Sequence, residues 1–353
     1  MIKYNHKKDD TMSNEMKAVG LYKHLPITDE ESLIDVTVPK PTASGHDILV
    51  RVKAVSVNPV DTKVRANGDE EDEPKILGYD ASGVVEEVGD DVSLFQVGDE
   101  VYYAGSVARP GSNSEFHLVD ERIVAQKPYT LSHKEAAALP LTSLTSWEAL
   151  FERLHIPFNQ TANQGKTILI IGAAGGVGSI ATQLAHMAGL TVIGTASREE
   201  TITWTKNRGA HYTINHHHSF GPQLEELGMN EVDYIFCLSS TAQHWDEMVN
   251  VIKPQGKICS IVETDENLNL SALQHKSATF VWEFMFTRPL FQTEDMREQH
   301  NILSHVAKLI DEGELTTTLT KTLTGLNAKN LREAHATLES GKMIGKLVLE
   351  QEG

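Results

Sequence analysis

The chain has 353 residues, of which 40% are hydrophobic and 23% are charged. This composition is ordinary for a globular protein, and the length is too great for one compact core and fits roughly two domains. The formal net charge is −18, so nucleic acid and anionic membranes are not expected as partners. The two cysteines, Cys237 and Cys259, are too few for a disulfide framework or a four-cysteine zinc cluster.

The beginning of the chain lacks the apolar segment of a secretory signal. Residues 1–15 are polar, and we expect them to form a flexible leader. Residues 167–197 contain no Asp, Glu, Lys or Arg and have the length of a membrane span, but a Gly-rich middle divides them into two β-rich runs. Without a signal or a span, the sequence predicts a cytoplasmic protein.

Short β-branched runs, separated by Gly, Pro and Asp, dominate the chain from residue 16 to about residue 139. The runs at residues 47–55, 82–89 and 99–103 alternate or cluster apolar residues, as strands do. The pattern predicts an all-β, barrel-like unit. The acidic run at residues 69–73 is expected on an exposed, solvated loop rather than at a cation site.

After residue 133 the pattern changes to helices and then to alternating strands and helices. Residues 134–154 are rich in helix formers. Strands are expected at 167–172, 190–195, 211–215, 232–237, 257–262, 279–284, 315–323 and 345–349, and helices at 178–189, 199–209, 301–312 and 330–340. Uncharged strands that alternate with helices predict a parallel sheet covered on both faces.

The strongest chemical signal is a Gly-rich turn, GAAGGVG at residues 172–178, between a buried-type strand and a helix. Gly175 and Gly178 match the second and third glycines of the dinucleotide fingerprint, and Ala173 takes the place of the first. Glycine lets the backbone approach a pyrophosphate, and the helix N-terminus supplies free N–H groups. A tight turn without a ligand is the alternative, but the strand–helix alternation around it favours a dinucleotide site.

The end of the second strand of this unit indicates which dinucleotide is bound. An NAD site has Asp or Glu about 20 residues after the fingerprint, but Ala196 stands there, followed by Ser197 and Arg198. A hydroxyl and a guanidinium suit a 2′-phosphate. The alternative is that Arg198 is a solvated residue at a helix start, paired with Glu199 or Glu200. We favour NADPH over NADH.

Six further segments carry recognisable motifs: residues 54–65, 77–89, 96–102, 136–150, 282–291 and 341–350. Together with the fingerprint they resemble the medium-chain dehydrogenase/reductase superfamily, and more narrowly its quinone oxidoreductase branch, in the group named zinc-type alcohol dehydrogenase-like proteins. The resemblance covers almost everything from residue 16 onward.

The resemblance implies an α/β protein of two domains. The first is a GroES-like, β-rich catalytic domain over residues 16–141 and 290–353. The second is an inserted Rossmann domain, a doubly wound parallel sheet over residues 142–289. The active site is expected in the cleft between them, and a homodimer is expected through edge-to-edge pairing of residues 279–284.

The sequence departs from the zinc enzymes of this superfamily, which bind catalytic zinc with two Cys and one His. The matching positions are Asn58, Tyr79 and Leu141, and none of these is a usual zinc ligand. Three adjacent histidines at residues 216–218 cannot all face one ion. We therefore expect no metal.

Members without zinc are expected to reduce a carbonyl or a conjugated C=C bond with hydride from NADPH, so hydrogen-bond donors must stabilise charge on the substrate oxygen. Asn58 is the first catalytic residue expected, because its amide can donate to the substrate. Asp61 is expected to orient that loop, and Tyr79 to donate through its phenol. The alternatives are that Asn58 and Asp61 only stabilise a turn of the backbone and that Tyr79 only lines the site.

The resemblance also implies which residues contact NADPH. Thr142 and Thr145 resemble residues near the nicotinamide, and His216 lies beside a position near the adenosine phosphate. Lys342 and Lys346 resemble basic residues near the phosphates, although either could be solvated. The expected cofactor-binding residues are Thr142, Thr145, Ala173, Gly175, Gly176, Val177, Gly178, Ser197, Arg198, His216, Cys237, Leu238, Ser239, Val262, Phe284 and Lys342.

The sequence thus predicts an NADPH-dependent oxidoreductase acting on a small electrophile: a quinone, an enal or a ketone. Two alternatives stay open. One is a zinc-dependent alcohol dehydrogenase, and the other is an NADPH-binding protein without catalytic activity.

Overall fold

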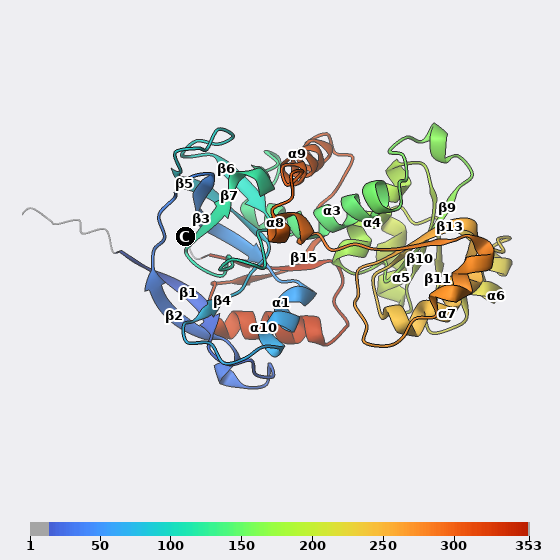
Figure 1. The fold of residues 1–353 in the computed structure, drawn as a ribbon, viewed down its shortest axis with the longest axis horizontal. Helices are drawn as coiled ribbons and strands as arrows, with labels where there is room; N and C mark the ends of the chain where they lie inside the picture. Colours follow the sequence, from blue (N-terminus) through green and yellow to red (C-terminus); the bar gives the residue numbers. More distant parts are fainter. Residues whose placement is uncertain (1–13, 352–353) are drawn as a thin grey trace, which may run out of the picture.

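The structure is a computed structural model that describes residues 14–351. The chain forms two lobes, one built from both ends of the chain and the other from its middle (Figure 1). Of the predicted leader, only residues 14 and 15 fall within the described part, and Glu15 already begins a strand. No helix in residues 14–351 is both long and apolar enough to cross a membrane.

The first lobe contains two sheets. The larger has seven strands in the order β15-β16-β3-β5-β6-β8, with β7 paired to β3. Its strands are β3 (Asp47–Ser56), β5 (Ala81–Val88), β6 (Glu100–Tyr103), β7 (Phe116–Asp120), β8 (Val124–Gln126), β15 (Leu319–Thr324) and β16 (Lys346–Glu350). The smaller sheet orders β2 (Ile34–Pro39), β1 (Glu15–Leu21) and β4 (Lys75–Ile76). Apolar residues of β3, β5 and β16 share one core with α10 (Ala328–Glu339).

The last strand joins the C-terminal segment to the first lobe. β16 runs antiparallel to β3, with Val348 opposite Ser56. The N–H of Val57 donates to the carbonyl of Leu347 at 3.3 Å. This register places Lys346, the first residue of β16, beside the segment that follows β3.

The second lobe is a six-stranded parallel sheet in the order β11-β10-β9-β12-β13-β14. Its strands are β9 (Thr167–Ile171), β10 (Thr191–Thr195), β11 (Tyr212–Ile214), β12 (Val232–Cys237), β13 (Ile252–Ser260) and β14 (Thr279–Trp282). The connecting helices are α4 (Gly176–Met187), α5 (Glu199–Asn207), α6 (Phe220–Glu226) and α7 (Thr241–Val251).

Alternate residues of the central strand β9 belong to different cores. Ile168 and Ile170 pack in one hydrophobic cluster with α4, and Leu169 and Ile171 pack in another. A strand covered on both faces has no position for a charged side chain, which is why this segment is uncharged. The predicted fold class, a GroES-like lobe with a doubly wound parallel sheet, is confirmed.

The two lobes are joined by helices. α2 (His133–Ala137) and α3 (Pro140–Trp147) lead from the first lobe into the second, and α3 continues as a π-helical turn, Glu148–Arg153. On the return, α8 (Thr287–Phe291) and α9 (Glu298–Asp311) lead back, and α9 lies against α3 and β8. Short 3₁₀ turns are formed by Glu30–Ser32, Glu121–Ile123, Thr161–Asn163 and Leu270–Lys276.

Four helices were not expected from the sequence: α1 (Pro59–Ala66), α6, α7 and α8. α1 is short and contains β-branched residues, which have low helix propensity. It is stabilised at its start by Pro59 in the first turn and by a capping box between Asn58 and Asp61.

Candidate active site

The Gly-rich turn has the geometry of an anion cradle. β9 ends at Ile171, and α4 begins after Gly175, its N-cap. A Cβ on Gly178 would lie 2.4 Å from the Gly172 oxygen and 2.6 Å from the Ala173 Cα, so only glycine permits this packing. A Cβ on Gly175 would meet only the Gly172 oxygen, at 3.7 Å. The space before the helix N-terminus is therefore open, and the turn fits a dinucleotide pyrophosphate.

The predicted cofactor-binding residues of the second lobe lie at one edge of its sheet. All six strands are parallel, so their carboxyl ends meet at the same edge, and the strand order reverses between β9 and β12. Each residue ends or follows a strand: Ala173 to Gly178 follow β9, Ser197 and Arg198 follow β10, His216 follows β11, Cys237 to Ser239 end or follow β12, Val262 follows β13 and Phe284 follows β14.

The Arg198 side chain contacts the backbone of Lys342 beyond the end of β10. The Arg198 Nη2 donates to the backbone oxygen of Lys342 at 3.0 Å. The Arg198 Nη1 lies 2.9 Å from Glu200 Oε1, so the ion pair that we considered as an alternative also forms. The guanidinium is partly exposed and is held beside the C-terminal segment.

His216 lies beside the next histidine of the chain. Its ring lies against the His217 ring, with centroids 4.4 Å apart. Burial, together with the charge of His217, lowers the pKa of His216, which is therefore neutral at pH 7. Within residues 14–351, no three His, Cys, Asp or Glu side chains are grouped so that they could hold a metal ion.

The helix α3 lies beside the Gly-rich turn. The Thr142 methyl group is 3.1 Å from the position that a Cβ on Gly176 would occupy, and its hydroxyl donates to Leu139 at 3.1 Å. Thr145 is also buried, one turn further along α3. Thr142 thus lies against the turn.

Asn58 and Asp61 form a buried unit at the start of α1. The Asn58 N–H donates to Asp61 Oδ2 at 2.8 Å, and neither side chain is more than 1% exposed. Burial raises the pKa of Asp61 to about 7. The Asp61 carboxyl therefore holds the backbone that carries Asn58.

A second carboxylate and a lysine complete this unit, and the sequence did not reveal their pairing. The Asn58 Nδ2 donates to Asp80 Oδ2 at 2.8 Å, and the Leu141 N–H donates to Asp80 Oδ1 at 2.8 Å. The Lys346 ammonium donates to Val57 O at 2.9 Å, to Asp80 Oδ2 at 3.1 Å and to Asn58 Oδ1. Lys346 is 4% exposed, so the solvated alternative for it is wrong.

Tyr79 lies next to this unit. Its ring packs edge-on against Phe286, with centroids 5.4 Å apart. Burial, together with the nearby Asp61, raises the pKa of Tyr79, so the phenol stays protonated at neutral pH. The hydroxyl forms no hydrogen bond within the described part of the chain, and it can donate to a bound molecule.

The residues at the superfamily's zinc positions do not fit zinc. Leu141 has no ligating atom, and Asn58 Oδ1 already accepts a hydrogen bond from the Lys346 ammonium. A second cation beside that ammonium would be repelled. These three positions therefore do not provide a set of zinc ligands.

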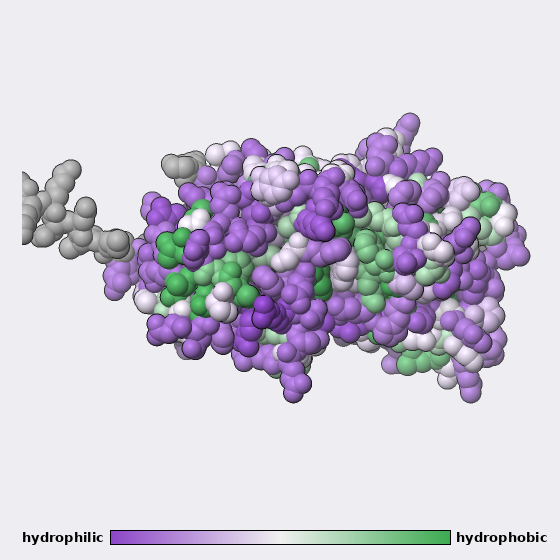
Figure 2. Space-filling model, turned by 90° about the horizontal axis from the view of Figure 1, so that it is seen from above, coloured by the Kyte–Doolittle hydropathy of each residue, from purple (hydrophilic) through white to green (hydrophobic). Residues whose placement is uncertain are grey.

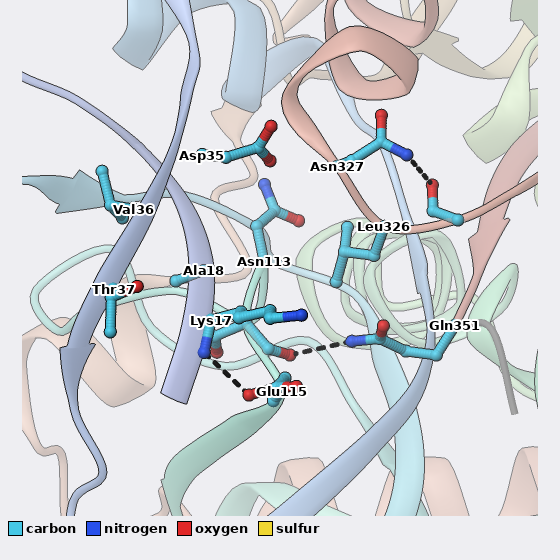
Figure 3. Close-up of a pocket in the computed structure, with 12 residues that line it drawn as sticks. Lys17, Ala18, Asp35, Val36, Thr37, Asn113, Glu115, Leu326, Asn327 and Gln351 are labelled. Atoms are coloured by element: carbon cyan, nitrogen blue, oxygen red, sulfur yellow. Dashed lines mark hydrogen bonds between the residues drawn. The ribbon is translucent and has the colours of Figure 1, made fainter. Parts of the chain in front are cut away.

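Two pockets in the first lobe lie away from this unit. The larger, about 540 Å³, is lined by β1, β2, the segment before β7 and the C-terminal segment (Figure 3). Its polar groups bond to one another: the Lys17 N–H donates to Glu115 at 2.7 Å, and Gln351 donates to Ser114 at 3.4 Å.

Polar residues cover most of the face in Figure 2, with apolar patches over both lobes.

The chain combines a β-rich lobe that carries a buried polar unit with a second lobe that carries a dinucleotide-type turn. This combination is typical of two-domain dehydrogenases and reductases. Two family models match the chain: "Alcohol dehydrogenase GroES-like domain" at residues 44–129 and "Zinc-binding dehydrogenase" at residues 208–349.

Relatives agree with this class. A Staphylococcus epidermidis zinc-type alcohol dehydrogenase-like protein is 45% identical over 95% of this chain and 99% of its own. A solved Rhizobium etli CFN 42 protein, named as a candidate zinc-dependent alcohol dehydrogenase, is 51% identical with a TM-score of 0.91, over 96% of this chain and 99% of its own. Mouse quinone oxidoreductase is 37% identical over 62% of this chain and 60% of its own. The chain belongs to the medium-chain dehydrogenase/reductase superfamily and is an oxidoreductase.

Proposed function

We propose that this protein is an NADPH-dependent reductase of the quinone oxidoreductase type, which transfers hydride to a quinone, an enone or enal, or another carbonyl compound without zinc. One observation carries the proposal: the buried polar unit touches the Gly-rich turn. A Cβ on Gly176 would lie 2.8 Å from Lys346 Cδ, and Lys346 Nζ bonds to Asn58 and Asp80. Hydrogen-bonding groups and a dinucleotide cradle therefore adjoin.

The residues of the chain supply hydrogen-bond donors, which stabilise the negative charge that develops on the substrate oxygen. NADPH, when bound, supplies hydride, and reduction of a carbonyl adds that hydride to carbon and a proton to oxygen. Tyr79 and Asn58 offer an O–H and an N–H for the developing negative charge on that oxygen. Since burial raises the pKa of Tyr79, its hydroxyl acts as a donor at neutral pH.

NADPH, rather than NADH, is supported by the groups beyond the end of β10. Ala196 has no carboxylate that would repel a 2′-phosphate, and the Arg198 guanidinium lies beside the Lys342 backbone. The substrate class is supported by the name of the mouse relative. The Staphylococcus epidermidis and Rhizobium etli relatives, which are similar over almost the whole chain, have names that include alcohol dehydrogenase, which is why the test below includes that reaction.

The test is a panel of acceptors followed by cofactor absorbance: 1,2-naphthoquinone, cinnamaldehyde and cyclohexanone, each with NADPH and with NADH, together with the oxidation of benzyl alcohol by NADP⁺ and by NAD⁺, with and without a chelator. We expect turnover of the quinone or the enal, with NADPH preferred. Tight NADPH binding without turnover of any acceptor would favour a non-catalytic NADPH-binding protein. Alcohol oxidation that a chelator abolishes would favour a zinc-dependent alcohol dehydrogenase.

A further inference from the structure

A buried ion pair surrounds the side-chain amide of Asn58. The Lys346 ammonium lies at the amide oxygen, and the Asp80 carboxylate lies 2.8 Å from the amide nitrogen. All three side chains are at most 4% exposed, so water does not screen the two charges. The three residues come from β16, the start of α1 and the segment before β5.

The charges determine which way the amide points. With the amide reversed, its NH₂ group would face the ammonium and its carbonyl would face the carboxylate. Both contacts would be repulsive in a site of low dielectric constant. The observed orientation is therefore strongly favoured over the reversed one.

The same arrangement leaves one N–H of Asn58 for another molecule. Nδ2 carries two N–H groups, and one donates to Asp80. A cation at the amide oxygen and an anion at the first N–H also polarise the amide.

We propose that Lys346 and Asp80 are positioning residues of the active site, which fix the Asn58 amide so that its second N–H points to the substrate or the nicotinamide carboxamide. This inference rests on the proposed reductase function. Lys346 also contacts the cofactor cradle, because its Cδ lies 2.8 Å from the Cβ position of Gly176. The lysine thereby links the amide to the second lobe.

A single Lys346→Met change would leave Asp80 buried without its partner, and a protein so changed can fail to fold. The test therefore uses the double variant Lys346→Met, Asp80→Asn, which removes both charges together and keeps the volume. In this variant the Asn58 amide can adopt either orientation. Lys321→Met is the matched control, because Lys321 is an exposed residue opposite Leu347 in the same sheet.

With 1,2-naphthoquinone and NADPH, we expect the double variant to remain folded, to keep its Kd for NADPH within about threefold, and to lose kcat on the order of 10²-fold. Lys321→Met should keep the wild-type kcat. If the residues served only to hold the fold, the stable double variant would retain kcat, and that result would overturn the proposal.

A second measurement does not depend on turnover. In protein labelled with ¹⁵N-asparagine, the side-chain signal of Asn58 is identified by its loss in Asn58→Asp. We expect the two proton shifts to be displaced from those of a free amide and protected from exchange with solvent in the wild type, and to lie near those of a free amide with faster exchange in the double variant. An unchanged Asn58 signal would overturn the positioning role even in an active enzyme. If the wild type reduces no acceptor, the proposed function fails, and this signal alone decides whether the ion pair orients the amide.

Discussion

Asp61 is a single carboxyl group whose burial links the stability of the first lobe to pH. Its pKa is raised from 3.8 to about 7, chiefly by burial. At a pH between these two pKa values, the Asp61 carboxyl has lost its proton in the unfolded chain but keeps it in the folded chain. The contribution of Asp61 to the free energy of unfolding therefore falls as pH rises through this range.

We predict that Asp61→Asn makes stability less dependent on pH. Between about pH 5.5 and pH 8 the wild type should lose about 2 kcal/mol that the variant does not lose, from the difference between the two pKa values. Urea unfolding at several pH values measures this. Asp246→Asn, at an exposed position on α7, is the control and should keep the wild-type dependence. Parallel curves for wild type and Asp61→Asn would contradict the prediction.

Arg198 is the residue on which the cofactor preference depends. We predict that Arg198→Ala weakens NADPH binding by about tenfold or more, because a charge-assisted hydrogen bond to phosphate is lost. NADH has no 2′-phosphate, so its Kd should change much less. Titration of both cofactors by fluorescence tests this.

Glu200 provides the control for this experiment, because it pairs with Arg198 at 2.9 Å. Glu200→Gln frees the guanidinium and should leave NADPH binding unchanged or tighter. Equal affinity of the wild type for NADPH and NADH would show that the preference is wrong.

At the level of elements, two glycines in the turn between β9 and α4 serve different purposes: one is required by the fold and the other by the ligand. Gly178 is needed for packing, since a Cβ there would lie 2.4 Å from a backbone oxygen. Gly175 has φ −72°, which any residue can adopt, and open space in front of it.

We predict that Gly175→Val folds but does not bind the cofactor, because the side chain would occupy the space of the pyrophosphate. Gly178→Val should instead melt at a much lower temperature, because the helix must move away from the strand. Thermal melts and NADPH titrations of both variants test the pair. Normal NADPH affinity in Gly175→Val would show that the turn is structural only.

For the whole molecule, the absence of a metal-ligand set at the superfamily's zinc positions predicts activity without metal. Leu141 cannot ligate, and Asn58 is occupied by Lys346. We expect elemental analysis of untagged protein to give far less than one zinc per chain, and chelation to leave NADPH-dependent reduction intact. Stoichiometric zinc, with activity lost on chelation and restored by zinc, would contradict this.

We also propose that two copies pair through β14, the edge strand of the six-stranded sheet. Trp282, the last residue of β14, and Phe284, which follows it, are 46% and 48% exposed. The Glu283 N–H donates inward to Ser260 at 3.0 Å, so alternation along the strand turns the Trp282 N–H outward.

Trp282→Pro should therefore shift a dimer toward the monomer without breaking the sheet, because proline is tolerated where the N–H faces outward. Light scattering measures the mass. Tyr129→Ser, at an exposed position in the other lobe, should leave the dimer intact. A monomeric wild type would contradict the proposal.

The second lobe could be predicted in most of its strands because its residues obey one local rule. The buried stretches of its strands are apolar runs, which are free of charge in β9, and the glycine pattern at residues 172–178 requires a turn between strand and helix. α7 could not be predicted in this way. Ser240 and Gln243 have the spacing of a capping box, but Ser240 has a left-handed backbone and its side chain forms no cap, so the start of this helix does not follow the local rule.

The amino-acid sequence by itself determined that a β-rich unit is followed by a parallel α/β unit with a Gly-rich turn, because hydrophobic periodicity and glycine spacing act between residues that are near in the chain. The return of the C-terminal segment to the first lobe was implied only by the resemblance to the superfamily. Only the tertiary structure decided the pairing of Lys346 with Asp80. These residues are 266 positions apart, and each alone is an ordinary charged side chain. The pairing of β16 with β3 brings them together in a buried site, where each charge stabilises the other because burial makes an unpaired charge costly.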